Sequence, residues 1–176
     1  MRYILLTVFI LAIFPAFSQQ AQKVTQYTPD STIMGTGVIE GSIREGLWKF
    51  YLTKTNSLVT EGTFKDGMRD GTWTLYYPNG KRREMADYRA GKLFGPAKYF
   101  DQDGALIKEM IFQDSIVVGK YTEYFGKTNA SASYISPTQV KVEGQYENGK
   151  KVGQWLSYYE FGELARNCNK VIASLQ

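Results

Sequence analysis

Apolar and polar residues recur along this chain with a period of about two dozen residues. In each period a glycine is followed two positions later by tryptophan in three of the five copies, and then by a pair of residues that is mostly aromatic, as in Trp73-Thr-Leu75-Tyr76-Tyr77. Successive anchor glycines are 25, 24, 24 and 34 residues apart. They are Gly46, Gly71, Gly95, Gly119 and Gly153. A fixed period in this range indicates a repeat architecture.

A second signal keeps a constant distance from the first. Seven positions before each anchor glycine stands a large apolar residue: Ile39, Phe64, Tyr88, Phe112 and Tyr146. Three positions after each of these comes a turn residue: Ser42, Gly67, Gly91, Ser115 and Gly149. The sequence therefore predicts five repeats, and Tyr27–Ser31 predicts an incomplete one before them.

Each repeat predicts two antiparallel strands joined by a tight turn. In the second copy, 73–77 is one strand, 78–80 is the turn, and 81–88 is the returning strand. Asn79-Gly80 is a hairpin signal because both residues tolerate positive φ. We expect Gly67 and Gly71 together to carry the chain into the next hairpin. The predicted fold is all-β: an elongated, single-layer antiparallel sheet of tandem hairpins.

Small residues stand two positions before each returning-strand apolar residue, which places both on one face of the strand. They are Gly37, Gly62, Ala86, Met110 and Gly144, with methionine as the exception in size. This pattern predicts rings packed closely over one face of the sheet. Cys168 falls at the same position of the last repeat, so we interpret it as a small core residue rather than a reactive thiol.

The N-terminal segment has the layout of an export signal. Arg2 precedes an apolar run, and small residues lead to Ser18 before the polar Gln19. We predict a signal peptide at 1–18, cleaved near Ser18, with an uncleaved anchor as the alternative. The protein would then be exported: periplasmic, envelope-associated or secreted. The remaining domain boundaries are a polar tail at 19–26, the repeat domain at 27–170 with an insertion at about 126–139, and a C-terminal tail at 171–176.

Composition excludes several kinds of chemistry. The formal charge is +4, but Lys and Arg alternate with Asp and Glu, so we expect no nucleic acid to bind. Histidine is absent and cysteine occurs once, which removes Ser–His and Cys–His nucleophiles, an intramolecular disulfide and any CxxC site. Asp101-Gln-Asp103-Gly104 lacks the other ligands of a calcium loop and predicts a turn. We expect no catalytic residues, no metal site and no cofactor.

A tyrosine in equivalent positions of four repeats is the candidate binding surface. These residues are Tyr51, Tyr76, Tyr124 and Tyr158, and strand spacing would place neighbouring repeats about 10 Å apart in a row. Tyrosine combines a large contact area with a polar tip, which suits recognition of proteins or glycans. The alternative is that the row only covers the second face of the sheet. The 126–139 insertion is either a second contact surface or a tolerated surface loop.

The repeat resembles the bacterial variant of the MORN repeat found in the YwqK-type antitoxin proteins. The second copy carries the motif most completely, and the resemblance extends over about 27–170. Its matching residues are Gly71, Trp73, Tyr76, Tyr77, Asn79, Gly80, Tyr88, Gly91 and Gly95. The third copy departs from the motif, with Ala97 in place of tryptophan and a longer turn. The resemblance implies an elongated sheet without enzymatic activity that acts as a scaffold, a partner-binding platform or, in some eukaryotic members, a membrane-associated module.

These observations lead to one main hypothesis of function. The chain is expected to be an exported, non-catalytic protein-binding or scaffold module of the bacterial envelope. The alternatives are a self-assembling structural component, an antitoxin-like protein that neutralises a partner, and a module that binds an envelope glycan.

Overall fold

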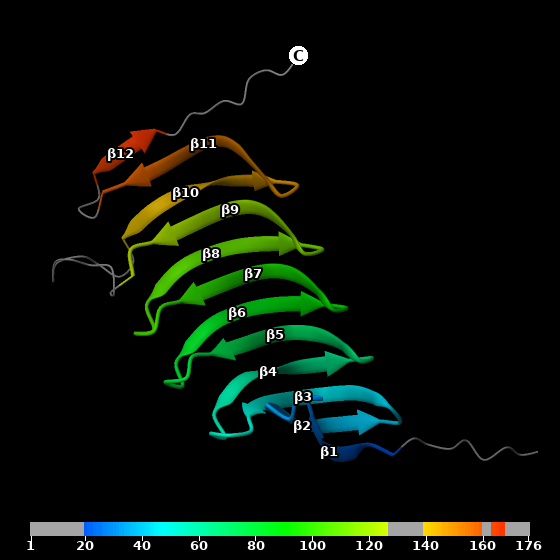
Figure 1. Cartoon of the computed structure of the whole chain (residues 1–176). Helices are drawn as coiled ribbons and strands as arrows, with labels where there is room; N and C mark the ends of the chain where they lie inside the picture. Colours follow the sequence, from blue (N-terminus) through cyan, green and yellow to red (C-terminus); the bar gives the residue numbers. More distant parts are fainter. Residues whose placement is uncertain (1–19, 127–138, 160–162, 168–176) are drawn as a thin grey trace, which may run out of the picture.

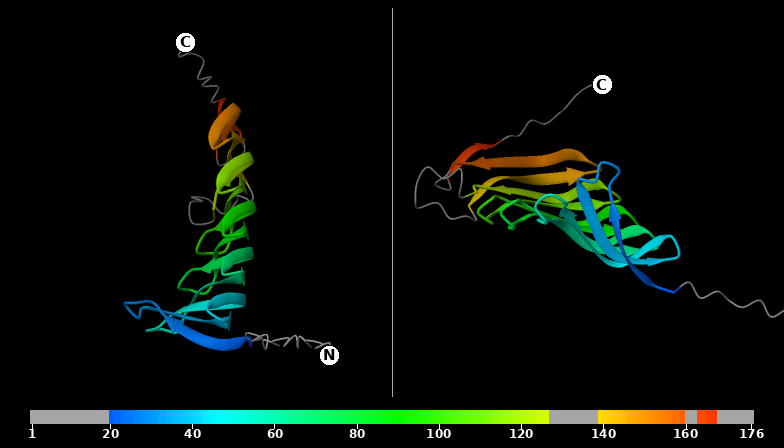
Figure 2. Two further views of the ribbon diagram at one scale, coloured as in Figure 1. Left: turned by 90° about the vertical axis from the view of Figure 1, so that its right-hand side faces the viewer. Right: turned by 60° about the horizontal axis from the view of Figure 1, so that its bottom comes forward.

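The described residues of the computed structural model, 20–126, 139–159 and 163–167, form one antiparallel β-sheet (Figure 1). Its twelve strands lie side by side in chain order. They are β1 (Gln22–Tyr27), β2 (Ile33–Glu40), β3 (Ile43–Leu52), β4 (Leu58–Lys65), β5 (Met68–Tyr76), β6 (Arg82–Arg89), β7 (Lys92–Phe100), β8 (Leu106–Gln113), β9 (Ile116–Tyr124), β10 (Val140–Glu147), β11 (Lys150–Tyr158) and β12 (Leu164–Asn167). The predicted all-β, single-layer sheet of tandem hairpins is confirmed. Figure 2 shows its elongated shape from two further sides.

The sheet begins earlier than the sequence predicted. Residues 22–26, assigned above to a polar tail, belong to β1, which pairs with β2 from Gln22↔Ile39 to Tyr27↔Met34. The prediction failed because β1 is mostly polar and exposed, so no apolar alternation marks it. The predicted signal peptide at 1–18, Cys168 and the predicted C-terminal tail at 171–176 lie outside the described residues.

Two-residue turns connect the strands on one side of the sheet, at the ends of the strands. In four of them both central residues have positive φ, the geometry of a type I′ turn: Asp66–Gly67, Ala90–Gly91, Asp114–Ser115 and Asn148–Gly149. The second residue of each turn also donates its backbone N–H to the preceding hairpin, as from Gly91 N to Arg69 O at 2.9 Å. Hydrogen bonds therefore join successive hairpins at these turns as well as along the strands.

At the opposite ends of the strands, the turn at Asn79-Gly80 differs from the expected one, in which both residues have positive φ. Only Gly80 has positive φ there, and Asn79 instead accepts the Lys81 N–H with its side-chain Oδ1 at 3.0 Å. Tyr77 N donates to Lys81 O across a three-residue loop at 2.8 Å. The Asp101 carboxylate likewise accepts the Asp103 and Ala105 N–H groups, which confirms the turn interpretation of that segment.

The insertion replaces one of these turns. Phe125 N donates to Gln139 O at 2.9 Å, the same closing bond that Tyr77 makes in its repeat. Residues 127–138 lie outside the described ranges. The extra chain thus enters and leaves the sheet at one turn position without changing strand order.

The five anchor glycines lie inside strands, so Gly67 in the turn and Gly71 in β5 carry the chain into the next hairpin in different ways. All five have positive φ, from 61° at Gly153 to 92° at Gly95. Each sits where the register with the preceding strand shifts, for example between Glu61↔Thr74 and Thr63↔Asp70. They are β-bulges, which require a residue that tolerates positive φ and which bend the strand. The curvature of the strands is visible in Figures 1 and 2.

One face of the sheet carries the core, and we call it the tryptophan face. Trp73 is fully buried although the sheet has only one layer. Its ring lies directly over Gly62 of the preceding strand, where an added Cβ would overlap it. On its outer side the Arg69 guanidinium carbon lies 4.3 Å from the ring centroid. The bulge also leaves the Thr63 carbonyl free to accept the indole N–H at 3.0 Å.

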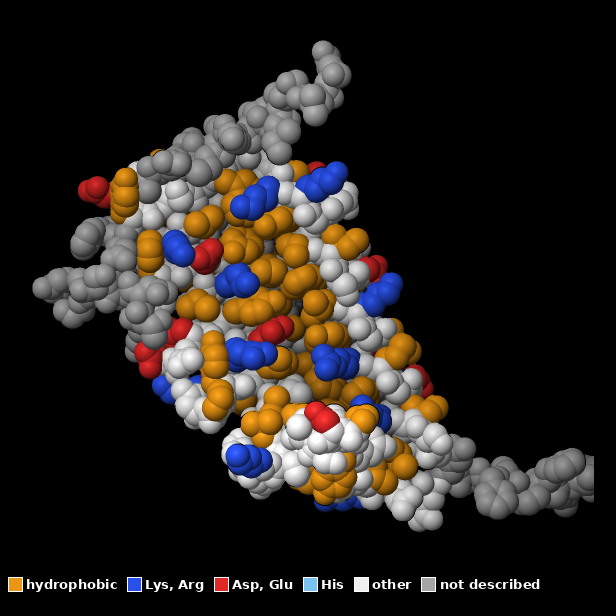
Figure 3. All heavy atoms as spheres, viewed as in Figure 1, with side chains coloured by type: hydrophobic (Ala, Val, Ile, Leu, Met, Phe, Trp, Pro, Cys, Tyr) orange, Lys and Arg blue, Asp and Glu red, His pale blue; other side chains and the backbone are white. Residues whose placement is uncertain are grey.

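Trp48 and Trp155 repeat this arrangement in the first and last repeats. Gly37 lies beneath Trp48 and Gly144 beneath Trp155, while Arg44 and Lys151 lie over the outer sides of these rings. Figure 3 shows hydrophobic side chains gathered in a band across the strands, with Lys and Arg among them. The predicted pairing of small residues with large rings is thus a close stack of glycine, indole and cation.

Candidate functional site: the tyrosine row

The four predicted tyrosines come together on the face opposite the tryptophans. Tyr51, Tyr76, Tyr124 and Tyr158 lie at the C-terminal part of every second strand, β3, β5, β9 and β11, and each is half-buried. Phe100 occupies the same place in β7 and completes the row. Phe100 was not among the predicted residues because the row was defined by tyrosine, although it stands five residues after Gly95 as Tyr76 does after Gly71.

The strands between the rings supply a second set of side chains to the row. Each ring residue pairs with the first residue, or the first ladder residue, of the following strand. These partners are Leu58, Arg82, Leu106, Val140 and Leu164. Rings and aliphatic side chains therefore alternate along one stripe, which we call the tyrosine row, and Arg82 is the single charged member.

Three hydroxyls of the row are held by carboxylates of the neighbouring strand. Tyr76 donates to Glu61 at 2.6 Å, Tyr124 to Glu109 at 2.6 Å, and Tyr158 to Glu143 at 2.8 Å. In each pair the glutamate precedes the tyrosine by 15 residues. These bonds fix the rings in one orientation, and the sequence analysis did not predict them.

The pairing changes the acid–base properties of the row. Partial burial, followed by the bond to glutamate, raises the pKa of Tyr76 and of Tyr124 to about 12. For Tyr158 the bond to Glu143 is the main reason that its pKa is raised. The Tyr76 hydroxyl in turn lowers the pKa of the Glu61 carboxyl. At neutral pH these three tyrosines are therefore neutral, and the Glu61 carboxyl is ionised.

Lysines neutralise two of these glutamates. Lys49 Nζ lies 3.1 Å from Glu61, and Lys120 Nζ lies 3.6 Å from Glu143. A carboxylate that already holds a tyrosine and a lysine is poorly suited to abstract a proton from a substrate. The arrangement supports a surface for contact rather than a catalytic pair.

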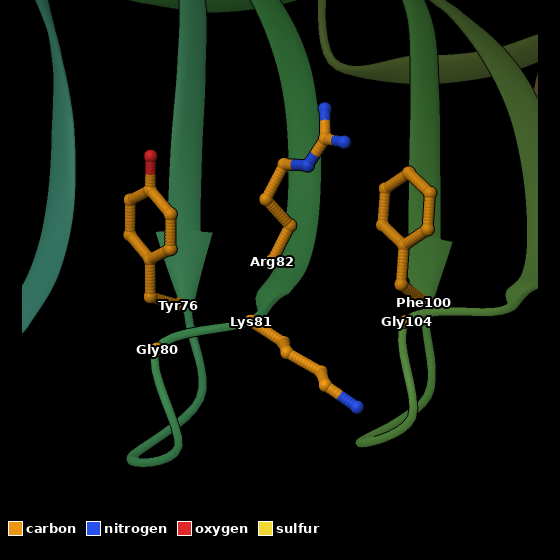
Figure 4. Close-up of a pocket in the computed structure, with 6 residues that line it drawn as sticks. All are labelled: Tyr76, Gly80, Lys81, Arg82, Phe100 and Gly104. Atoms are coloured by element: carbon orange, nitrogen blue, oxygen red, sulfur yellow. The ribbon is translucent and has the colours of Figure 1, made fainter.

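A shallow groove interrupts the row between two hairpin loops (Figure 4). Tyr76, Arg82 and Phe100 project side by side from β5, β6 and β7, and Lys81 lies at the groove's outer end. The two loops that flank the groove are joined by three bonds. Tyr77 Oη donates to Phe100 O, Asn79 Nδ2 to Gln102 O, and Lys81 Nζ to Asp103 O, at 2.8, 2.9 and 3.0 Å.

The described residues contain no group of three or more His, Cys, Asp or Glu side chains placed to hold a metal ion. Within the same ranges no helix is long and apolar enough to cross a membrane.

Comparison with known proteins agrees with the repeat architecture. The model of the MORN repeat variant family matches residues 69–90, which span β5, its turn and β6. No curated protein matches the chain. Among solved structures, the crystal structure of TarM aligns with 65% of this chain and 20% of its own length, at 14% identity and a TM-score of 0.38. The matched segment is one hairpin of the repeat that recurs through the sheet, and over this hairpin the chain matches the MORN repeat variant.

Proposed function

We propose that this protein is an exported, non-catalytic module that binds a protein partner through the tyrosine row. The observation that supports it is the fixed orientation of the rings. Three hydroxyls are bonded to glutamates, so the side chains have little rotamer freedom left to lose on binding. Rigid aromatic groups flanked by aliphatic side chains are typical anchors of protein interfaces.

The openness of the row favours a partner over a purely structural role. The ring residues remain partly exposed, and the described chain places no second layer over them. Leu164 at the end of the row is 53% exposed. A partner that covered the row would remove this apolar surface from water.

Site-specific cross-linking tests the proposal directly. Tyr51 is the best position for a photoreactive phenylalanine analogue, because its hydroxyl has no glutamate partner among the described residues whose loss would disturb the fold. The matched control is Leu47, on the same strand and face and 55% exposed. With envelope extract, we expect a discrete protein adduct at 51 and none at 47. Equal labelling at the two positions, or none at 51, would contradict a binding row.

Loss of the rings provides a second test. We expect the double substitution Tyr76→Ser and Tyr124→Ser to remove the partner identified by cross-linking. Leu47→Ser with Lys98→Ser, on the same face but outside the row, should leave it bound. Circular dichroism and thermal melting must first show that both double variants keep the sheet.

Export is tested separately. Fractionation of the source cells and N-terminal sequencing should find a mature chain that begins near Gln19 outside the cytoplasm. A cytoplasmic chain that retains Met1 would overturn this part of the proposal without touching the row.

The two ends of the sheet support self-assembly as a second candidate function. β1 pairs only with β2, and β12 only with β11, so each leaves one backbone edge open within the described residues. Such edges can pair with another strand. Light scattering over a hundredfold range of concentration should show growing assemblies if this is the function, and a constant monomer mass would reject it.

A further inference from the structure

The tyrosine row reverses its charge at one place. Three of the row's rings stand over a glutamate, but at the position equivalent to Glu61 the third repeat has Met85. The ring there is Phe100, which has no hydroxyl to donate. Beside it, the position that is aliphatic in the other four repeats is Arg82. All three exceptions lie on the adjacent strands β6 and β7.

Arg82 is the charge that this exchange leaves unbalanced. Its Cζ lies 5.6 Å from the centroid of the Phe100 ring, and its Nη1 lies 3.3 Å from Met85 Sδ. Within the described part of the chain no carboxylate pairs with it. The neighbouring cation, Lys81, is already 3.8 Å from Asp103. An exposed guanidinium that has no carboxylate partner among the described residues therefore faces the groove of Figure 4, beside a ring.

The groove is built to keep this geometry. The bonds that join its two flanking loops hold Arg82 and Phe100 at a fixed separation. The Tyr76 hydroxyl turns to Glu61, so this ring offers the groove mainly its apolar surface. What remains for a ligand is one cationic fork between two ring surfaces.

We propose that this groove binds an acidic side chain of a peptide, with apolar residues of the same peptide resting on the rings of Tyr76 and Phe100. The guanidinium fork matches a carboxylate. A neutral sugar fits less well, because its hydroxyls need acceptors and the nearby carboxylates are occupied: Glu61 by Tyr76 and Lys49, Asp103 by Lys81. This inference rests on the proposed function and specifies which part of a protein partner the row would contact.

A blocked pentapeptide tests the groove without knowledge of the partner. The probe is acetyl-Gly-Phe-Glu-Phe-Gly-amide, and its control carries Gln in place of Glu. Titration into the chain from residue 19 onward, labelled with ¹⁵N, should shift the Arg82 side-chain and Phe100 backbone signals. An exposed ion pair of about 1 kcal/mol corresponds to about fivefold tighter binding of the Glu peptide. That preference should shrink in 0.5 M salt.

Arg82→Leu is the decisive variant because four of the five repeats carry an aliphatic residue at this position, so the sheet accommodates it. We expect it to abolish the preference for Glu over Gln, whereas Arg83→Leu, its exposed neighbour, should preserve it. Equal shifts with both peptides, or an unchanged preference in Arg82→Leu, would overturn the proposal. So would glucuronate that shifts the same signals more strongly than the Glu peptide, because the ligand would then be an anionic glycan.

The two proposals fail in different ways. If the cross-link at Tyr51 forms and Arg82→Leu changes nothing, the row binds a partner and the groove inference is wrong. If no partner cross-links but the Glu preference depends on Arg82, the groove recognises carboxylates and the proposed function is wrong.

Discussion

The repeats that carry tryptophan differ from the two in the middle at three coupled positions. Trp48, Trp73 and Trp155 each lie between a glycine of the preceding strand and a cation two residues before the anchor glycine. In the third repeat the three positions are Ala86, Ala97 and Leu93, and in the fourth they are Met110, Tyr121 and Val117. The stack is therefore present as a unit or replaced as a unit.

This difference divides the core into two aromatic clusters. Trp48, Phe50, Phe64, Trp73 and Tyr88 form a chain of ring contacts with centroid separations of 5.0 to 6.5 Å. Tyr121, Tyr146 and Trp155 form a second, with separations of 5.2 to 5.7 Å. The alanine pair Ala86↔Ala97 lies between them. The size of the residue beneath the ring position and the size of the ring above it therefore vary together from repeat to repeat.

The largest effect is expected from removing a ring of the first cluster. Trp73→Ala should lower the free energy of unfolding by about 3–5 kcal/mol, because the ring is fully buried and touches three others. Trp155→Ala should lower it by about 1 kcal/mol less. Trp155 contacts two rings, and its indole N–H has no acceptor among the described residues. Urea unfolding followed by far-ultraviolet circular dichroism measures both, and equal losses would contradict the comparison.

Filling the space beneath a ring should be nearly as damaging. In Gly62→Ala the new methyl group would overlap the Trp73 ring, and we expect a loss of about 2–3 kcal/mol in the same unfolding experiment. Gly62→Ala combined with Trp73→Ala reproduces the small pair of the third repeat. The second substitution should then cost much less than it does alone, and strict additivity of the two would show that the stack is not a unit.

The converse exchange tests whether the sheet can accept a ring at the alanine pair Ala86↔Ala97, between the two aromatic clusters. Ala97→Trp alone should destabilise the sheet, because the Ala86 methyl group occupies the place beneath the new ring. Adding Ala86→Gly and Leu93→Arg supplies the glycine beneath the new ring and the cation over it. We expect the three positions to couple by about 1–2 kcal/mol in urea unfolding. Absence of coupling would mean that other side chains around Ala97, and not positions 86 and 93, determine whether a large ring fits there.

The sequence was sufficient to predict the repeat, the strand pairs and the two faces, because those depend on short intervals between glycine and large apolar residues. It did not predict that Gly71 forms a bulge, because a glycine with positive φ suits a turn or a bulge equally well. It did not predict β1, whose strand character comes from pairing with β2 rather than from its own apolar pattern.

The site was harder to predict than the fold. The tyrosine row was found by position, but its glutamate partners depend on the strand register, which each bulge shifts by two residues. A signal did exist: Glu61, Glu109 and Glu143 each stand immediately before the position beneath the ring, which is Gly62, Met110 or Gly144. Arg82 and Met85 could have been noticed as exceptions, but their meaning depends on lying side by side in the folded sheet.

The same comparison between repeats ranks the hydroxyls of the row. In Tyr76→Phe, Glu61 keeps Lys49 at 3.1 Å. In Tyr124→Phe, Glu109 loses the one hydrogen bond of its side chain among the described residues. We expect about 1 kcal/mol of destabilisation for Tyr124→Phe and about half of that for Tyr76→Phe. Phe100 shows that a phenylalanine ring fits the row, so a larger loss at Tyr76 than at Tyr124 in urea unfolding would show that the lysine does not compensate.

The hydroxyls of the row also make stability depend on alkaline pH. The pKa of Tyr76 and of Tyr124 is about 12 in the folded sheet, against an ordinary value of 10.0. Between these values the unfolded chain has lost protons that the folded chain still holds. The stabilisation that these two residues provide is therefore complete below pH 10 and is lost as the pH rises towards 12. Urea midpoints measured from pH 9 to 11.5 should fall in the wild type.

The double variant Tyr76→Phe and Tyr124→Phe separates the row from the other tyrosines in this titration. It is less stable at pH 8, because two hydroxyl–glutamate bonds are gone, but its midpoint should fall less steeply above pH 10. Tyr121, whose pKa on the tryptophan face is likewise raised to about 12 by burial and by Glu123, provides the matched comparison as Tyr121→Phe. If the urea midpoint fell equally steeply with pH in the wild type, the double variant and Tyr121→Phe, none of these three tyrosines would be the source of the pH dependence. A flatter slope only in the double variant would place it in the row, where the rings of alternate strands hold their hydroxyls against the carboxylates beside them.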